Sequence, residues 1–80
     1  MIYVENREIN QHEAEVGYSA DASDLGLKPG IWPEELSGMD AAGEPLEFRR
    51  IQAVRVRNDH SELAGYIYEA LDYRLVVFND

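Results

Sequence analysis

Residues 46–57, "LEFRRIQAVRVR", decide the fold class. A segment of this length that is rich in apolar, β-branched and aromatic side chains is typical of a β-strand. The apolar residues that share one face of this strand are Leu46, Phe48, Val54 and Val56. Strict alternation would place two polar residues, Arg50 and Gln52, on that same face. We therefore expect either a β-bulge near residues 50–53, which resets the alternation, or two strands that meet there.

Turn-forming residues on both sides of this run divide the second half of the chain into further strands. We expect strands at "EELSGM" (34–39), "LAGYIYEA" (63–70) and "YRLVVFN" (73–79), with turns at "DAAGEP" (40–45), "NDHSE" (58–62) and Leu71–Asp72. One segment, 61–71, also fits a helix, because Ser61 can act as N-cap and the apolar residues that follow have helical spacing. Gly65 and the "YIY" cluster favour a strand.

The first half of the chain predicts two more strands. "IYV" (2–4) opens a short one, which ends near Asn6. "EAEVGYSAD" (13–21) alternates cleanly, with small, apolar or aromatic side chains on one face and acidic or small side chains on the other. The alternation therefore predicts a half-buried strand with an acidic outer face. The acids on that face are Glu13, Glu15 and Asp21.

The segment "DLGLKPGIWPEEL" (24–36) combines glycines and prolines with the only tryptophan of the chain. Ser23 or Asp24 can cap a single helical turn, which Gly26 would end. "KPGI" (28–31) predicts a type II turn, because proline presets the second position and glycine permits the positive φ of the third. Pro33 favours extended geometry at Trp32, so we expect this ring to plug one end of the core.

These elements predict a mainly β protein, in which a single small antiparallel sheet of five or six strands curls into a barrel or sandwich and one short helical turn is added. The class would become α+β if residues 61–71 were helical. A chain of 80 residues has room for one domain, so residues 1–80 are expected to form a single globular unit.

Two segments carry a resemblance to other proteins. "ASDLGLKPGIWPEEL" (22–36), together with "LVVFND" (75–80), resembles a pattern seen in small uncharacterised bacterial, prophage and phage proteins. This resemblance covers about a quarter of the chain. It implies a phage or mobile-element setting, in which small acidic proteins recur as inhibitors of host defence enzymes, and it carries over no catalytic residue.

Charge is distributed unevenly along the chain. The formal net charge is −9, and residues 1–47 hold 11 acids against only Arg7 and Lys28, whereas residues 48–80 hold five of each sign. Nucleic acid binding needs a concentrated basic surface, so we expect no direct nucleic acid partner. An acidic protein favours a protein partner with a basic surface.

The same composition bears on location. The chain has no cysteine, and the segment "MIYVENREIN" (1–10) carries charge among its first residues and no long apolar run. These features predict an intracellular protein without a membrane-spanning segment. We expect a cytoplasmic location, which is the host cytoplasm if the protein is phage-encoded.

Two groups of residues contain side-chain types that occur in catalytic or metal sites. "DHS" (59–61) contains the residue types of a catalytic triad, but neighbours in a turn diverge in space. His12 with Glu13 and Glu15 offers too few convergent ligands for a transition metal. The basic run 49–57 is expected to be a solvated strand face whose arginines pair with acids across strands. We therefore predict no catalytic residue, no metal and no cofactor, and hence a protein that is not an enzyme.

The acidic side chains are the best functional candidates. The residues predicted to contact a partner are Glu13, Glu15, Asp21, Glu34, Glu35, Asp40 and Glu44, with Trp32 as a further aromatic contact. They predict a small interaction protein, in the phage setting an inhibitor, that binds the basic nucleic-acid-binding surface of a host protein. The alternative is a structural or assembly module that forms a homodimer or larger particle through sheet edges or exposed aromatic residues.

Overall fold

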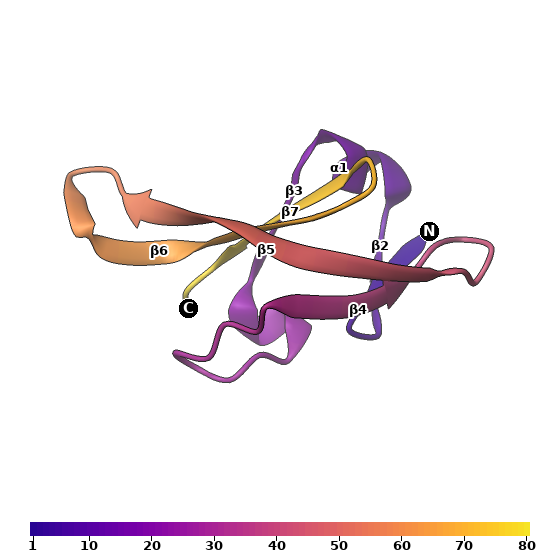
Figure 1. Cartoon of the computed structure of the whole chain (residues 1–80), viewed down its shortest axis with the longest axis horizontal. Coiled ribbons are helices and arrows are strands. Elements are labelled where there is room, and N and C mark those ends of the chain that lie inside the picture. Colours follow the sequence, from indigo (N-terminus) through magenta and orange to yellow (C-terminus); the bar gives the residue numbers. More distant parts are fainter.

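Two strands of 12 residues each, β5 (Pro45–Val56) and β6 (Asp59–Ala70), form the hairpin at the centre of the sheet (Figure 1). The computed structural model describes all 80 residues and places 56% of them in strands. The pairing of β5 with β6 shifts register between Arg50 and Gln52, which confirms the predicted bulge. The strand interpretation of residues 61–70 is also confirmed.

The turn of this hairpin is shorter than expected. Only Arg57 and Asn58 form it, and Asp59 to Glu62 already belong to β6, so the prediction of a turn across 58–62 is wrong at its end. The polar residues there suit a turn locally, but the pairing with β5 extends the strand through them. Beyond residue 50, β5 pairs only with β6, and β6 pairs only with β5 before Gly65, so the hairpin projects as a twisted ribbon (Figure 1).

Five shorter strands complete the sheet. On the β5 side follow β4 (Glu35–Met39), β1 (Ile2–Val4) and β2 (Arg7–Ile9), and on the β6 side follow β7 (Tyr73–Phe78) and β3 (Tyr18–Asp21). The order is β2-β1-β4-β5-β6-β7-β3, so the sheet has seven strands rather than five or six. Strand β2 has three residues, which are too few to show an alternating pattern.

One strand pair departs from the antiparallel expectation. Strand β3 pairs with β7 in parallel, Tyr18 opposite Leu75 and Asp21 opposite Phe78. The other strand pairs are antiparallel. Because β3 and β7 lie far apart along the chain, no short turn fixes their relative direction, and packing of the whole sheet decides it.

The segment 13–21 is predicted as one strand, and its first half is instead helical. Helix α1 (Gln11–Val16) begins after Asn10, whose side chain accepts hydrogen bonds from the backbone N–H groups of His12 (2.9 Å) and Glu13 (3.4 Å). It ends at Gly17, which has φ 102°. The strand prediction is wrong for this part because these two caps outweigh the local alternation.

The helical turn and the type II turn are both confirmed. The 3₁₀ turn η1 (Ala22–Leu25) ends at Gly26, which has φ 73°. In "KPGI" the N–H of Ile31 donates to the Lys28 carbonyl at 3.1 Å, and Gly30 has φ 74°. The chain therefore reverses where proline and glycine required it to.

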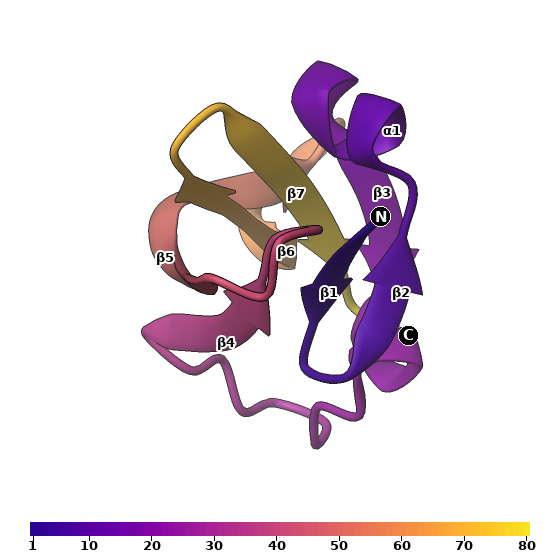
Figure 2. The same cartoon turned by 90° about the vertical axis from the view of Figure 1, so that its right-hand side faces the viewer.

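The sheet curls into a half-barrel, and the core fills its concave face (Figure 2). The largest fully buried side chains are Tyr68, Phe48, Ile2, Ile9, Leu36, Leu75, Val4 and Val77. No charged residue is buried. Leu46 and Phe48 lie in the core as expected, whereas Val54 and Val56 are only half-buried because they belong to the projecting ribbon.

Candidate functional site

The segment between η1 and β4, residues 26–34, is hydrogen-bonded to the core face of the central hairpin, and we call it the link. Arg50 donates from Nη1 to the carbonyl of Trp32 at 2.7 Å and from its backbone N–H to the carbonyl of Glu34 at 2.9 Å. The hydroxyl of Tyr68 donates to the carbonyl of Pro33 at 2.6 Å, and burial raises the pKa of this phenol. Three consecutive carbonyls, at residues 32–34, are thereby satisfied from one side, which fixes the backbone of the link.

Aromatic contacts orient the Trp32 ring. It meets Tyr66 edge to face, with ring centroids 5.2 Å apart, and the guanidinium of Arg50 lies 5.0 Å from the centroid of Tyr66. Trp32 packs against the core and is half-buried. The prediction that Trp32 packs against the core is therefore confirmed, but the ring is not fully enclosed. Part of it lines a pocket.

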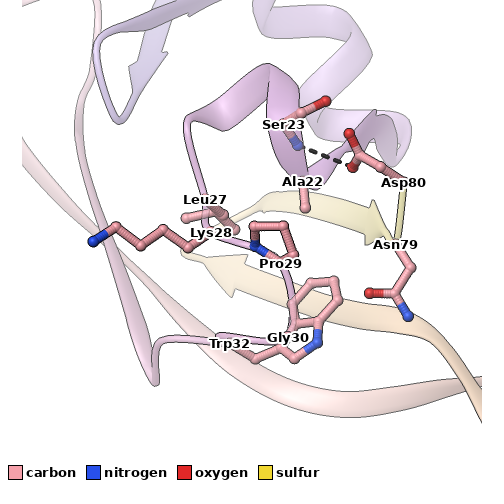
Figure 3. Close-up of a pocket in the computed structure, with 9 residues that line it drawn as sticks. All are labelled: Ala22, Ser23, Leu27, Lys28, Pro29, Gly30, Trp32, Asn79 and Asp80. Atoms are coloured by element: carbon pink, nitrogen blue, oxygen red, sulfur yellow. Dashed lines mark hydrogen bonds between the residues drawn. The ribbon is translucent and has the colours of Figure 1, made fainter.

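This pocket, which we call the Trp32 pocket, has a volume of about 150 Å³ and lies between η1, the link and the last two residues (Figure 3). Its lining residues are Ala22, Ser23, Leu27, Lys28, Pro29, Gly30, Trp32, Asn79 and Asp80. The Asp80 carboxylate accepts a hydrogen bond from the Ser23 N–H at 3.0 Å. Hydrogen bonds from Ser23 lower the pKa of Asp80, so this carboxylate is ionised at neutral pH.

The seven acids predicted to form one face are divided into three groups. Glu34 and Glu35 lie beside Arg49 and Arg50, with which they line an open polar hollow. Asp40 and Glu44 lie in the turn between β4 and β5. There the Asp40 carboxylate accepts from the N–H groups of Ala42 and Glu44, each at 2.9 Å, so it holds the turn.

The third group remains without basic neighbours in sequence. Glu13 and Glu15 project from α1, and Asp21 ends β3, so the acids lie at the two ends of an edge strand. No Lys or Arg occurs from residue 8 to residue 27. We call this part of the molecule the acidic edge, and its exposed carboxylates are Glu13, Glu15, Asp21, Asp24 and Asp80.

Two members of the acidic edge were missed in the sequence. Asp24 lies in η1, where its carboxylate accepts from the N–H of Asp21 at 3.3 Å. Asp80 follows β7, and it reaches η1 because β7 pairs with β3. The capping pattern pointed to Asp24, but no local signal relates Asp80 to a residue 57 positions earlier.

Neither residues 59–61 nor the group of His12, Glu13 and Glu15 forms a site in the structure. Ser61 donates its hydroxyl to Asp59 at 2.6 Å, and this bond, with that of its backbone N–H, lowers the Asp59 pKa. His60 lies between them on β6, where consecutive side chains point to opposite faces, so the three do not form the relay of a triad. His12, Glu13 and Glu15 lie exposed on α1, and no group of three or more potential ligands is placed to hold a metal ion.

The arginines of the basic run have different neighbours. Arg49 lies opposite Glu35 on one side and Glu69 on the other, and Glu69 lies opposite Arg74. This row of alternating charge crosses four strands on the exposed face of the sheet, but none of these side chains forms an ion pair within 4.0 Å, so the predicted pairing of arginines with acids is limited to register. Arg55 instead lies on the projecting ribbon, opposite Leu63.

A scan against protein-family models gives no match, and neither the curated proteins nor the solved structures include one that matches this chain. No helix is long and apolar enough to cross a membrane.

Proposed function

We propose that this protein is a small non-enzymatic interaction protein that binds the basic, nucleic-acid-binding surface of a partner protein. The observation that carries the proposal is the acidic edge. Five exposed carboxylates lie on α1, on η1 and at the ends of β3 and β7, and the segment from residue 8 to residue 27, which carries four of them, contains no Lys or Arg.

The uneven distribution of charge favours one orientation of a basic partner on the protein. Four of the seven basic side chains belong to the β5–β6 hairpin and its turn, whereas the segment from residue 8 to residue 27 has none. The same hairpin also holds four acids and is formally neutral, so a basic partner is attracted more strongly to the edge than to the hairpin. Such complementarity raises the association rate and selects one orientation, and both effects weaken as salt screens the charges.

The resemblance to small phage and prophage proteins suggests what the partner does. We propose a phage setting in which the partner is a host defence protein that binds nucleic acid. The acidic edge then occupies the surface that this host protein uses for phosphates, so binding of the two is mutually exclusive. The protein acts as an inhibitor by competition and needs no catalytic group of its own.

The test compares three baits in bacterial lysate: the native protein, an edge variant and a control variant. The edge variant carries Glu13→Gln, Glu15→Gln and Asp21→Asn, and the control carries Glu44→Gln, Glu47→Gln and Glu62→Gln, which are exposed acids elsewhere. Both variants lose three negative charges, so a difference between them reports position rather than net charge.

We expect the native and control baits to recover the same nucleic-acid-binding protein and the edge variant to recover at least about tenfold less of it. The purified partner should then release a labelled oligonucleotide when the native protein is added. Equal recovery by all three baits, or a partner that binds the oligonucleotide and this protein together, would contradict the proposal.

One feature favours the alternative, an assembly module. From residue 51 to residue 56, β5 pairs with β6 on one side and with no strand on the other, because the pairing of β4 ends at Arg49. Ile51 lies on this free edge and is 51% exposed. An unpaired edge of this kind is able to accept a strand from a second copy.

Assembly predicts a mass that increases with concentration in analytical ultracentrifugation, and a decrease of that mass in the variant Ile51→Lys, because a charge on an edge opposes strand addition. Ala41→Lys adds the same charge in the exposed turn between β4 and β5 and serves as the control for net charge. A constant monomeric mass up to millimolar concentration would exclude this alternative.

A further inference from the structure

We propose that the Trp32 pocket receives a lysine side chain of the basic partner. This inference rests on the proposed function and adds to it a specific contact. The pocket lies next to Asp24 and Asp80 of the acidic edge, because Ala22 and Ser23 of η1 form one of its walls. A partner seated on the edge therefore brings its basic side chains to the mouth of the pocket.

The pocket has the size of such a side chain. Its volume is about 150 Å³, and a cavity of roughly this volume holds a benzene molecule. A lysine side chain is of similar bulk, with a flexible stem of about four carbons and one ammonium group. The larger planar guanidinium of arginine needs more room.

The walls suit the lysine stem. Leu27, Pro29 and Trp32 contribute the apolar surface, and Figure 3 shows the Pro29 ring beside the Trp32 ring. Methylene stems pack on such surfaces while the charged end stays polar. Trp32 also attracts cations to its ring face. Because Arg50 and Tyr66 already hold Trp32, the partner does not have to order this ring.

The polar end of the pocket suits an ammonium group. The exposed Asp80 carboxylate accepts from Ser23, and because its two oxygens together offer about four acceptor positions it can also accept from a ligand. Asn79 donates its amide N–H to the carbonyl of Leu63 at 2.9 Å, which leaves its amide oxygen as a second acceptor. The one cation of the lining, Lys28, points away from Asp80 (Figure 3). The pocket thus presents acceptors and selects a cation over an anion.

The test uses a blocked tripeptide, acetyl-Gly-Lys-Gly-amide, and the matching peptide with norleucine, which has a similar stem and no charge. Binding is followed by NMR at the indole N–H of Trp32, the side-chain amide of Asn79 and the backbone amide of Ser23. We expect saturable shifts of all three with the lysine peptide at millimolar concentration, and an affinity lower by at least about fivefold with norleucine.

Asp80→Asn should weaken binding of the lysine peptide by about three- to tenfold. Asp59→Asn is the matched control, because Asp59 is likewise an exposed aspartate bound by a nearby serine, and it should leave the affinity unchanged. The comparison of lysine with norleucine on the native protein needs no variant, so it stands even if Asp80→Asn does not fold.

Equal binding of both peptides would overturn the inference, because the pocket would then select apolar stems alone. Tighter binding of a third peptide, acetyl-Gly-Arg-Gly-amide, or no shift with the lysine peptide at tens of millimolar, would overturn it as well. The two proposals fail separately. If the edge variant loses the partner but the lysine peptide leaves the three signals unchanged, the proposed function stands and the lysine pocket is wrong. If the peptide binds and the edge variant keeps the partner, the proposed function is wrong.

Discussion

The β5–β6 hairpin and the acidic edge are built in different ways. The hairpin consists of two 12-residue strands that contribute Leu46, Phe48, Tyr68 and Ala70 to the core. The edge consists of elements of four to six residues, α1, β3 and η1, and most of what it buries is alanine. The difference teaches that a region which buries large side chains and a region which buries mainly small ones can share one sheet, with the exposed charge gathered on the second.

The largest expected effect comes from the hairpin core. Phe48→Ala should lower the free energy of unfolding by about 3–5 kcal/mol, because Phe48 is fully buried and its removal leaves a cavity. Glu15→Gln on the acidic edge should change it by less than about 0.5 kcal/mol, since this side chain is exposed. Urea unfolding followed by circular dichroism measures both. Similar losses in the two variants would remove the contrast between the regions.

The junction between the two regions depends on Gly65. A methyl group at this position would collide with the backbone carbonyl of Val77 in β7, the only strand that holds β3. Gly65→Ala should therefore destabilise the protein by about 3 kcal/mol and loosen the acidic edge with it. In Gly43→Ala the added group meets open space, and only the positive φ of 84° costs about 1 kcal/mol. Thermal unfolding that ranks the two variants in the opposite order would contradict this prediction.

Within the acidic edge, the cap of α1 is the sensitive point. Asn10→Ala removes the side chain that accepts from His12 and Glu13, so the free energy of unfolding should fall by about 1 kcal/mol. Hydrogen exchange should accelerate in α1 and not in the hairpin. Asn10→Asp keeps an acceptor and should leave the exchange rates close to native. Faster exchange throughout the sheet in Asn10→Ala would show that the edge supports the core after all.

The smallest effect concerns one carboxylate in each region. Hydrogen bonds from serine hold the pKa values of Asp59 and Asp80 below 3.8. Because these folded-state pKa values are depressed, their contribution to stability is present above about pH 4 and is lost as the pH falls through them. Ser61→Ala should raise the pKa of Asp59 toward 3.8 and leave Asp80 unchanged, as measured by NMR titration of the carboxyl carbons. Equal shifts at both residues would contradict local control.

Sequence reasoning succeeded where the decisive interactions are local. The bulge near Arg50, the turn of "KPGI" and the strand at residues 63–70 are each specified by side chains within a few positions of one another. It failed at 13–16, where period-two alternation concealed a capped helix. The signal was present, because Asn10 with Glu13 three positions later is a helix-start pattern, and Gly17 marks the end.

For the candidate site, the sequence placed the acids in the right half of the chain but joined them into one face. Glu34 and Glu35 lie with arginines, and Asp40 holds a turn, so neither group extends the edge formed around α1 and η1. Asp80 was missed and Lys28 was not placed relative to it, because both depend on the pairing of β7 with β3.

By itself, the sequence determined a mainly β chain, its strong turns, the long central strands and the excess of negative charge in the first 47 residues. These properties follow from local backbone preferences and from composition, which no later packing removes. Only the tertiary structure decided the parallel pairing of β3 with β7, the fastening of residues 32–34 by Arg50 and Tyr68, and the pocket between Trp32 and Asp80. Each of these joins residues distant in the chain, and their contact is set by burial of the shared core rather than by any local pattern.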